Sequence, residues 1–179
     1  WIHLRNDSRC AQRVIAMRDR RFIVVHRGGP LPKAEHYLLS AWAADCAEHV
    51  LPLFTARSDD DRPARAIETA RQWARGEIRV GVSMKAAVTA HAAAREASDP
   101  AAIAAARAAG HAVATAHFAE HSLGAVVYGL KAVAAAGGDV EAERAWQIAQ
   151  LPDTVRELVI SALASERMQR AMPRLSRDA

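Results

Sequence analysis

Three histidines, His111, His117 and His121, have the side-chain type and spacing that could support chemistry. His117 and His121 are four residues apart, so on one continuous helix they could share a metal ion, with Glu120 or Asp45 completing the site. The intervening sequence reads HFAEH rather than HExxH, so the zinc-protease arrangement with its internal general base is absent. Histidines on an alanine-rich face more often bond a neighbouring helix, and we expect that role, with no metal or cofactor.

These histidines lie in the alanine-rich stretch 99–138, around which the chain is organised. Asp99 followed by Pro100 is typical of a helix start, as N-cap and first helical residue. A single helix to the end of this stretch would be unusually long, so we expect a break near 119–122 and close helix packing at the glycines. Continued helically, one face would carry Gly110, Ala114, His117, His121, Gly124 and the candidate binding residue Tyr128.

A second polar group, Asp45, Cys46 and His49, spans about one turn of another expected helix. A nucleophilic cysteine needs exposure and a lowered pKa, whereas Cys46 falls on the apolar side of this helix. We therefore predict no catalytic residue here and keep Asp45 and His49 as candidate binding residues. The glycines at 28–29 lack the strand–loop–helix context of a phosphate loop, and no serine has the GxSxG neighbourhood of a hydrolase.

Composition favours helices over strands. The chain has 179 residues, of which 51% are hydrophobic and 5% aromatic, and alanine makes up nearly half of the hydrophobic set. Alanine has the highest helix propensity, while a sandwich or barrel needs more β-branched and aromatic residues. We predict an all-α fold, an irregular bundle of seven to eight helices with a short N-terminal β-like clip.

The expected organisation has three parts. Residues 1–30 would form an N-terminal helix and an extended clip containing the β-like run 22–25, residues 31–170 the alanine-rich bundle, and residues 171–179 a frayed tail, with the chain polar from Arg167. Capping and breaker residues place helices at about 9–18, 32–51, 62–75, 82–97, 140–150 and 153–166.

The net charge of +4 comes from the first 30 residues, which carry seven arginines against two aspartates. The rest of the chain is close to neutral, so we do not expect nucleic-acid binding. Two distant cysteines and the lack of a long apolar run or signal-peptide pattern favour a cytoplasmic protein that does not enter a membrane. Asp59, Asp60 and Asp61 form an acidic loop expected to cap the next helix.

Several runs of the sequence resemble a family of small bacterial proteins described as putative immunity proteins. They are HRGG (26–29), SAWAADCAEHVLPLF (40–54), RPARAIETARQWARGEIRVG (62–81), AAARAAGHAVATAHFAEHSLGAVVYGLKAV (104–133) and LPDTVRELVISAL (151–163). The resemblance implies an all-helical, cytoplasmic, non-enzymatic protein that binds and neutralises a toxin domain.

The contact surface stays open at this point. Asp59, Asp60 and Asp61 would suit a basic toxin, and the N-terminal arginines an acidic one. The alternatives to an immunity protein are a metal- or small-ligand-binding helical enzyme and a self-associating module such as a homodimer. The enzyme would use the histidines already named, with His91, Asp45 or His49.

Overall fold

The structure is a computed structural model, and it describes residues 19–173. Within these residues the chain is helical and has no β-strand, only an isolated parallel bridge between Val24 and Leu31. The prediction of an all-α irregular bundle is therefore confirmed. Its α-helices are α2 (Lys33–Val50), α3 (Pro52–Thr55), α4 (Arg62–Ala74), α5 (Val80–Glu96), α6 (Pro100–Ala114), α7 (His121–Ala135), α8 (Val140–Ala149), α9 (Asp153–Leu163) and α10 (Glu166–Ala171).

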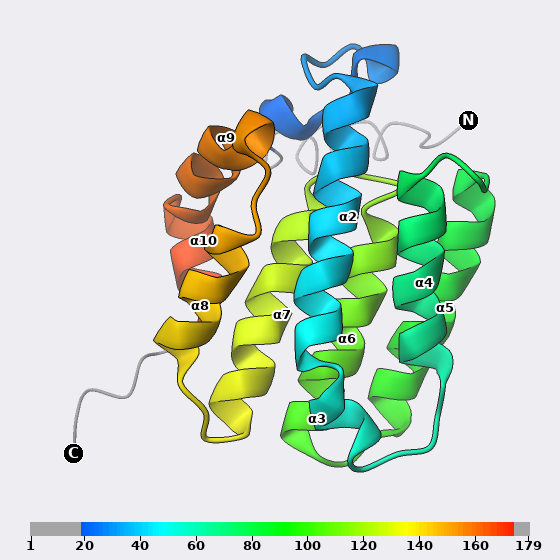
Figure 1. Ribbon diagram of the computed structural model, residues 1–179, viewed down its shortest axis with the longest axis vertical. Coiled ribbons are helices and arrows are strands. Elements are labelled where there is room, and N and C mark those ends of the chain that lie inside the picture. Colours follow the sequence, from blue (N-terminus) through cyan, green and yellow to red (C-terminus); the bar gives the residue numbers. More distant parts are fainter. Residues whose placement is uncertain (1–18, 174–179) are drawn as a thin grey trace, which may run out of the picture.

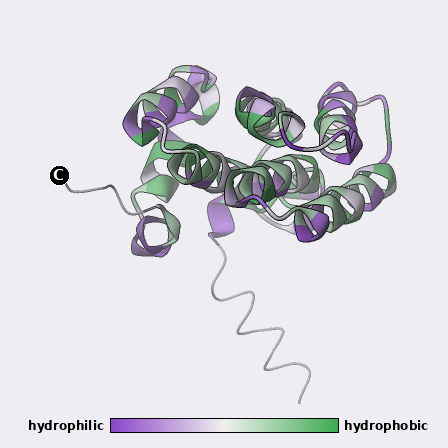
Figure 2. Cartoon of the chain, turned by 90° about the horizontal axis from the view of Figure 1, so that it is seen from below, coloured by the Kyte–Doolittle hydropathy of each residue, from purple (hydrophilic) through white to green (hydrophobic). Residues whose placement is uncertain are grey.

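The helices are arranged in two layers beside a smaller group. Helices α5, α6 and α7 lie side by side, and α2 and α4 pack across one side of them (Figure 1). The view from below shows the two rows (Figure 2). Helix α8 packs against α7, while α9 contacts α2 and α10. We call the side of the α5–α7 layer that faces away from α2 and α4 its outer face.

The predicted helix boundaries rest on identifiable caps. Asp99 Oδ1 accepts a hydrogen bond from Ala102 N at 2.9 Å, and Asp139 Oδ1 accepts one from Ala142 N at 2.9 Å. Gly137 ends α7 with a φ of +72°, a conformation that a glycine adopts without strain. At α4 the predicted acidic loop supplies the cap through Asp60, whose Oδ1 accepts a hydrogen bond from Arg62 N at 2.9 Å.

Alanine fills the interface between the two layers. Five alanines of α6 are fully buried, and the large buried side chains come mainly from the helices around it. In Figure 2 the row formed by α5, α6 and α7 is coloured largely as hydrophobic. Because a methyl group is the bulkiest side chain at most inward positions of α6, neighbouring helices approach closely and leave no room for larger residues. The five alanines are Ala105, Ala106, Ala108, Ala109 and Ala112.

The break in the stretch 99–138 begins earlier than predicted. Helix α6 ends at Ala114 and α7 begins at His121, so 115–120 form a connector and His117 and His121 do not share a helix. Buried Thr115 fixes this connector: its Oγ1 donates to the carbonyl of His111 at 3.2 Å, and its own carbonyl accepts from His36 Nε2 at 2.6 Å. The common face that a continuous helix would have given these two histidines therefore does not form.

Only part of the run 22–25 is extended. Phe22 ends the 3₁₀ turn Arg20–Phe22 and Val25 begins the turn Val25–Arg27, while Ile23 and Val24 between them are extended and Val24 forms the isolated bridge to Leu31. Near the other end, the polar segment that starts at Arg167 is helical as far as Ala171, the first residue of the predicted frayed tail. The predicted helix at 9–18 and the residues 174–179 of the predicted tail lie outside the described residues.

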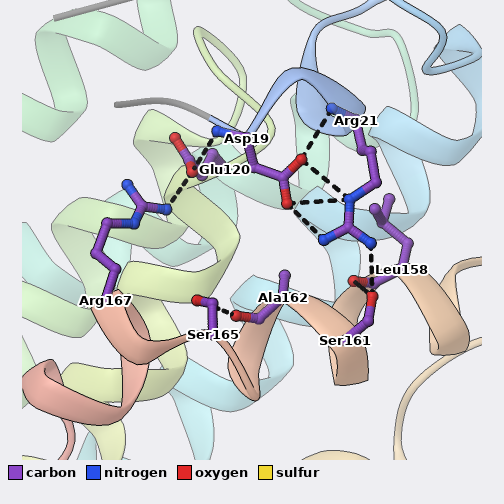
Figure 3. A network of polar contacts seen from close by, with 8 residues as sticks. All are labelled: Asp19, Arg21, Glu120, Leu158, Ser161, Ala162, Ser165 and Arg167. Carbon is purple, nitrogen blue, oxygen red and sulfur yellow. Dashed lines mark hydrogen bonds and ion pairs between the residues drawn. The ribbon is translucent and has the colours of Figure 1, made fainter. Parts of the chain in front are cut away.

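A polar network fastens the start of the described chain to distant elements (Figure 3). Arg21 bonds the carboxylate of Asp19, with the shortest contact at 2.6 Å, and donates to Ser161 Oγ of α9 at 2.7 Å. The backbone N–H of Asp19 donates to Glu120 Oε1 at 3.3 Å, and the Glu120 carboxylate pairs with Arg167 of α10. The first turn is thereby tied to both the α6–α7 connector and the C-terminal helices.

The alanine interface predicts a strong asymmetry between inward and outward substitutions. Ala109→Leu adds bulk at a fully buried position of α6 and should lower the free energy of unfolding by about 1–3 kcal/mol. Ala135→Leu, at the exposed end of α7, is the matched control and should change it by less than about 0.5 kcal/mol. Urea denaturation measures both, and equal effects of the two substitutions would contradict the packing argument.

Candidate functional site

The outer face of the α5–α7 layer brings together most of the predicted ring-bearing residues. The ring of His111, on α6, is stacked on Tyr128 of α7, with centroids 5.0 Å apart and planes 17° apart. The ring of His91, on α5, contacts the His111 ring edge-on with centroids 5.3 Å apart, and the centroid of the His121 ring lies 5.5 Å from that of His111. Three of the predicted binding residues, His111, His121 and Tyr128, therefore form one cluster, which His91 joins from the neighbouring helix.

Two glycines make this cluster possible. A Cβ atom on Gly110 would lie 2.6 Å from His91 Cε1, and one on Gly124 would lie 2.5 Å from His111 Nδ1. The imidazole rings therefore occupy the space that alanine methyl groups would fill elsewhere on these helices. At each of these glycines an imidazole ring lies close to the helix backbone. The sequence had instead predicted that the glycines allow two helices to pack closely.

The cluster holds its central histidine in the neutral form. Burial, together with the smaller effects of the neighbouring His121, His91 and Arg107, lowers the pKa of His111 to about 3. Burial likewise lowers the pKa of His91. His111 Nδ1 is buried and has no hydrogen-bond partner among the described residues. At neutral pH the imidazole of His111 is therefore uncharged and stacks on the Tyr128 ring.

The geometry does not assemble the metal site considered from the sequence. Within residues 19–173, no group of three or more His, Cys, Asp or Glu side chains is placed to hold a metal ion. His117 lies in the connector, where its ring packs edge-on against Phe118 with centroids 4.3 Å apart. The carbonyl of His117 accepts a hydrogen bond from Arg27 Nη1 at 3.1 Å. This residue therefore joins the clip to the connector.

Asp45 and His49 lie on α2 but make contacts in different directions. Asp45 Oδ1 pairs with Arg71 of α4 at 2.8 Å. His49 Nδ1 bonds Glu143 Oε2 at 2.7 Å, and its ring is stacked on Trp146 of α8 with centroids 3.7 Å apart. These two predicted binding residues hold α2 to its neighbours on opposite sides and do not meet the histidine cluster.

Cys46 is fully buried between these two residues, and its thiol is unsuited to nucleophilic chemistry. Burial raises its pKa well above the usual range, with the carboxylates of Glu143 and Asp45 adding to the effect. Since a reactive cysteine needs a thiolate that substrate can reach, the interpretation of Cys46 as a packing residue is supported.

The acidic loop carries less free charge than its sequence suggests. The Asp60 carboxylate accepts from Arg62 Nε at 2.9 Å, and this contact lowers the pKa of Asp60. Asp61 pairs with Arg65 at 3.1 Å, while Asp59 is exposed. Two of the three carboxylates predicted as partner contacts are thus already matched by arginines of the same segment.

Two cations beside the cluster were missed by the sequence reasoning. The Arg107 guanidinium lies 5.6 Å from the centroid of the Tyr128 ring, and Lys131 Nζ lies 5.1 Å from it. The spacing held a signal, since Arg107 precedes His111 by four residues and Lys131 follows Tyr128 by three, which places each pair on one helix face. The Arg107/His111 pair and the Tyr128/Lys131 pair come together only because α6 packs against α7.

Comparison with known proteins identifies the family. The sequence model described as Imm-5 like putative immunity protein matches residues 29–154, which is more than half of the chain. The chain belongs to this family. The match spans α2 to α8 and so contains the whole histidine cluster. No curated protein and no solved structure matches the chain. The resemblance noted in the sequence is thereby confirmed.

Among the described residues, no helix is long and apolar enough to cross a membrane. The longest, α2, has 18 residues and carries several charged side chains.

The neutral state of His111 predicts how stability responds to acid. Below pH 6.5 the unfolded chain binds a proton at this residue, whereas the folded chain does so only near pH 3, so the free energy of unfolding falls as the pH falls. His111→Phe keeps a ring on Tyr128 but cannot bind that proton. Between pH 7 and pH 5 the variant should lose about 2 kcal/mol less than the wild type.

Urea denaturation at the two pH values measures this difference. The exposed His26→Asn is the control and should lose as much stability as the wild type. If His111→Phe also loses as much as the wild type, the ring of His111 is not held neutral by the fold.

Proposed function

We propose that this protein is an immunity protein that binds a toxin domain and neutralises it by occlusion, without catalysis. The observation that carries the proposal is its membership of the Imm-5 like putative immunity protein family. We further propose that it acts in the cytoplasm, where it would protect the cell that makes it from a toxin encoded nearby.

The arrangement of polar groups supports binding rather than turnover. A general acid or base works best with a pKa near the working pH, while the pKa values of His91 and His111 are lowered by burial. Two other candidates, Asp45 and His49, hold helices together through Arg71 and Glu143. A protein that acts by occlusion needs a rigid, complementary surface and no reactive group. The tightly packed alanine layer is suited to supply such rigidity.

The experiment that tests the proposal is a titration of the toxin-like domain encoded beside this gene. Residual toxin activity is measured against increasing amounts of the purified protein. Occlusion predicts a linear fall that ends at one equivalent, since each toxin molecule must hold one inhibitor. Arg170→Ala, on the exposed side of α10, serves as the control and should reach the same endpoint.

The shape of the titration separates the two classes of function. An enzyme that modifies the toxin would abolish its activity at far less than one equivalent, with an effect that grows with time. Either that result or unchanged toxin activity at excess protein would overturn the proposal.

A further inference from the structure

We propose that the outer face of the α5–α7 layer is the docking surface for the toxin domain, and that it binds an acidic patch on that domain. The inference rests on the proposed function and adds which surface is used and what chemistry the partner presents there. The residues that define the surface are Met84, Val88, Arg95, Arg107, Tyr128 and Lys131.

Nearly all charged side chains on the helices of this layer are cations. Helices α5, α6 and α7 carry the cations Lys85, Arg95, Arg107 and Lys131 and a single acidic residue, Glu96. The Glu96 carboxylate is bonded to Arg62 of α4, and this contact lowers its pKa. Within the described chain, no carboxylate forms an ion pair with Arg95, Arg107 or Lys131. The outer face therefore presents positive charge that the fold itself does not neutralise.

Two arginines of the other layer provide a contrast. Arg71 pairs with Asp45 and Glu48, and Arg75 pairs with Glu68 and Glu77. Charges matched in this way gain little from a partner, because an incoming group must compete with the existing pair. An acidic surface is therefore attracted more strongly to the unmatched cations of the α5–α7 layer than to Arg71 or Arg75.

The face also has an apolar side on α5. Met84 and Val88 are 45% and 66% exposed, and together with His91 and Arg95 they follow a spacing of four, three and four residues that marks one side of a helix. His91 in this row contacts His111, which is stacked on Tyr128. An apolar strip, a cluster of rings and a pair of cations are thus continuous across three helices.

This combination is typical of the centre of a protein interface. Tyrosine, methionine and arginine are enriched there, and partly buried aromatic rings often supply most of the binding energy. Tyr128 is held between the Arg107 and Lys131 cations and the ring of His111, so little of its side-chain freedom remains to be lost on binding. Carboxylates of the partner would bond the two cations while an apolar group covers Met84 and Val88.

Other occupants fit the surface less well. A symmetric pair of copies joined through this face would bring Arg107 and Lys131 against the same cations of the second copy. A nucleic acid would use the positive charge, but its phosphates would leave the exposed side chains of Met84 and Val88 uncovered by apolar groups. An acidic protein surface with an apolar centre satisfies both parts of the face.

The test compares two double charge reversals in their binding to the toxin-like domain encoded beside this gene. Arg107→Glu with Lys131→Glu changes the outer face, and Lys33→Glu with Arg144→Glu makes the same change in net charge on α2 and α8. Lys33 is a matched control because it lies 5.2 Å from the centroid of the Tyr37 ring, which repeats the contact of Lys131 with Tyr128. Affinity is measured by calorimetry at several salt concentrations.

The outer-face pair should weaken binding at least about 100-fold, and the control pair less than about threefold. The affinity of the wild type should fall more steeply with salt than that of the outer-face variant. Val88→Arg keeps every positive charge and should still weaken binding about tenfold, so it tests the apolar part even where the double reversal fails to fold. Lysines in place of the partner's acidic residues should restore binding to the reversed face.

The outcomes separate this inference from the proposed function. If the toxin domain binds and the outer-face pair and Val88→Arg bind as the wild type does, the surface is wrong while the immunity function stands. If the wild type itself does not bind, both fail. Tight binding of an oligonucleotide to the wild type that the same reversal abolishes, with no effect on the toxin domain, would also overturn the inference.

Discussion

Close packing of alanine-lined helices is the constraint on which the rest of this bundle depends. With methyl groups at most inward positions of α6, the axes of α5 and α7 lie close to it on both sides, and α2 and α4 pack directly across the layer. Each close contact buries little area, so the stability of the layer depends on many such contacts being made together. The bulkier residues Phe54 and Ile67 belong to the same buried cluster as these alanines, and Trp42 belongs to a second buried cluster.

The same close spacing explains the unusual place of the histidines. Helices this near to one another have no room for rings except where a residue lacks a side chain, and Gly110 and Gly124 supply those places. The rings then lie between helices and lose most of their contact with water, which favours their neutral form. Burial therefore turns residues that suggested metal binding into a packed aromatic cluster around His111.

Charge is distributed by layer. The helices α2 and α4 carry carboxylates and arginines that meet one another across their contact, as Arg71 does with Asp45 and Glu48. In α5, α6 and α7 the cations face outward, and the one carboxylate, Glu96, is bonded by an arginine of α4. Surface ion pairs of the first kind contribute little to stability, but they remove charge that a partner could recognise. The distinction between matched and unmatched charge supports the choice of the outer face as a docking surface.

The fold class, the helix caps at Asp99 and Asp139 and the burial of Cys46 are predictable from the sequence, because they depend on propensities and on neighbours within one or two helical turns. The sequence placed the break before α7 too late, since Thr115 is fixed by His36. Of the run 22–25 predicted as β-like, Val24 alone has a β-type partner, Leu31, among the described residues. Three outcomes depend on the packing of the helices. His91, His111 and Tyr128 meet, and Asp45 and His49 contact different helices. Arg107 and Lys131 have no carboxylate partner in the described chain. Those outcomes depend on which helices lie side by side, and residues far apart in the chain settle that through packing, which local spacing does not encode.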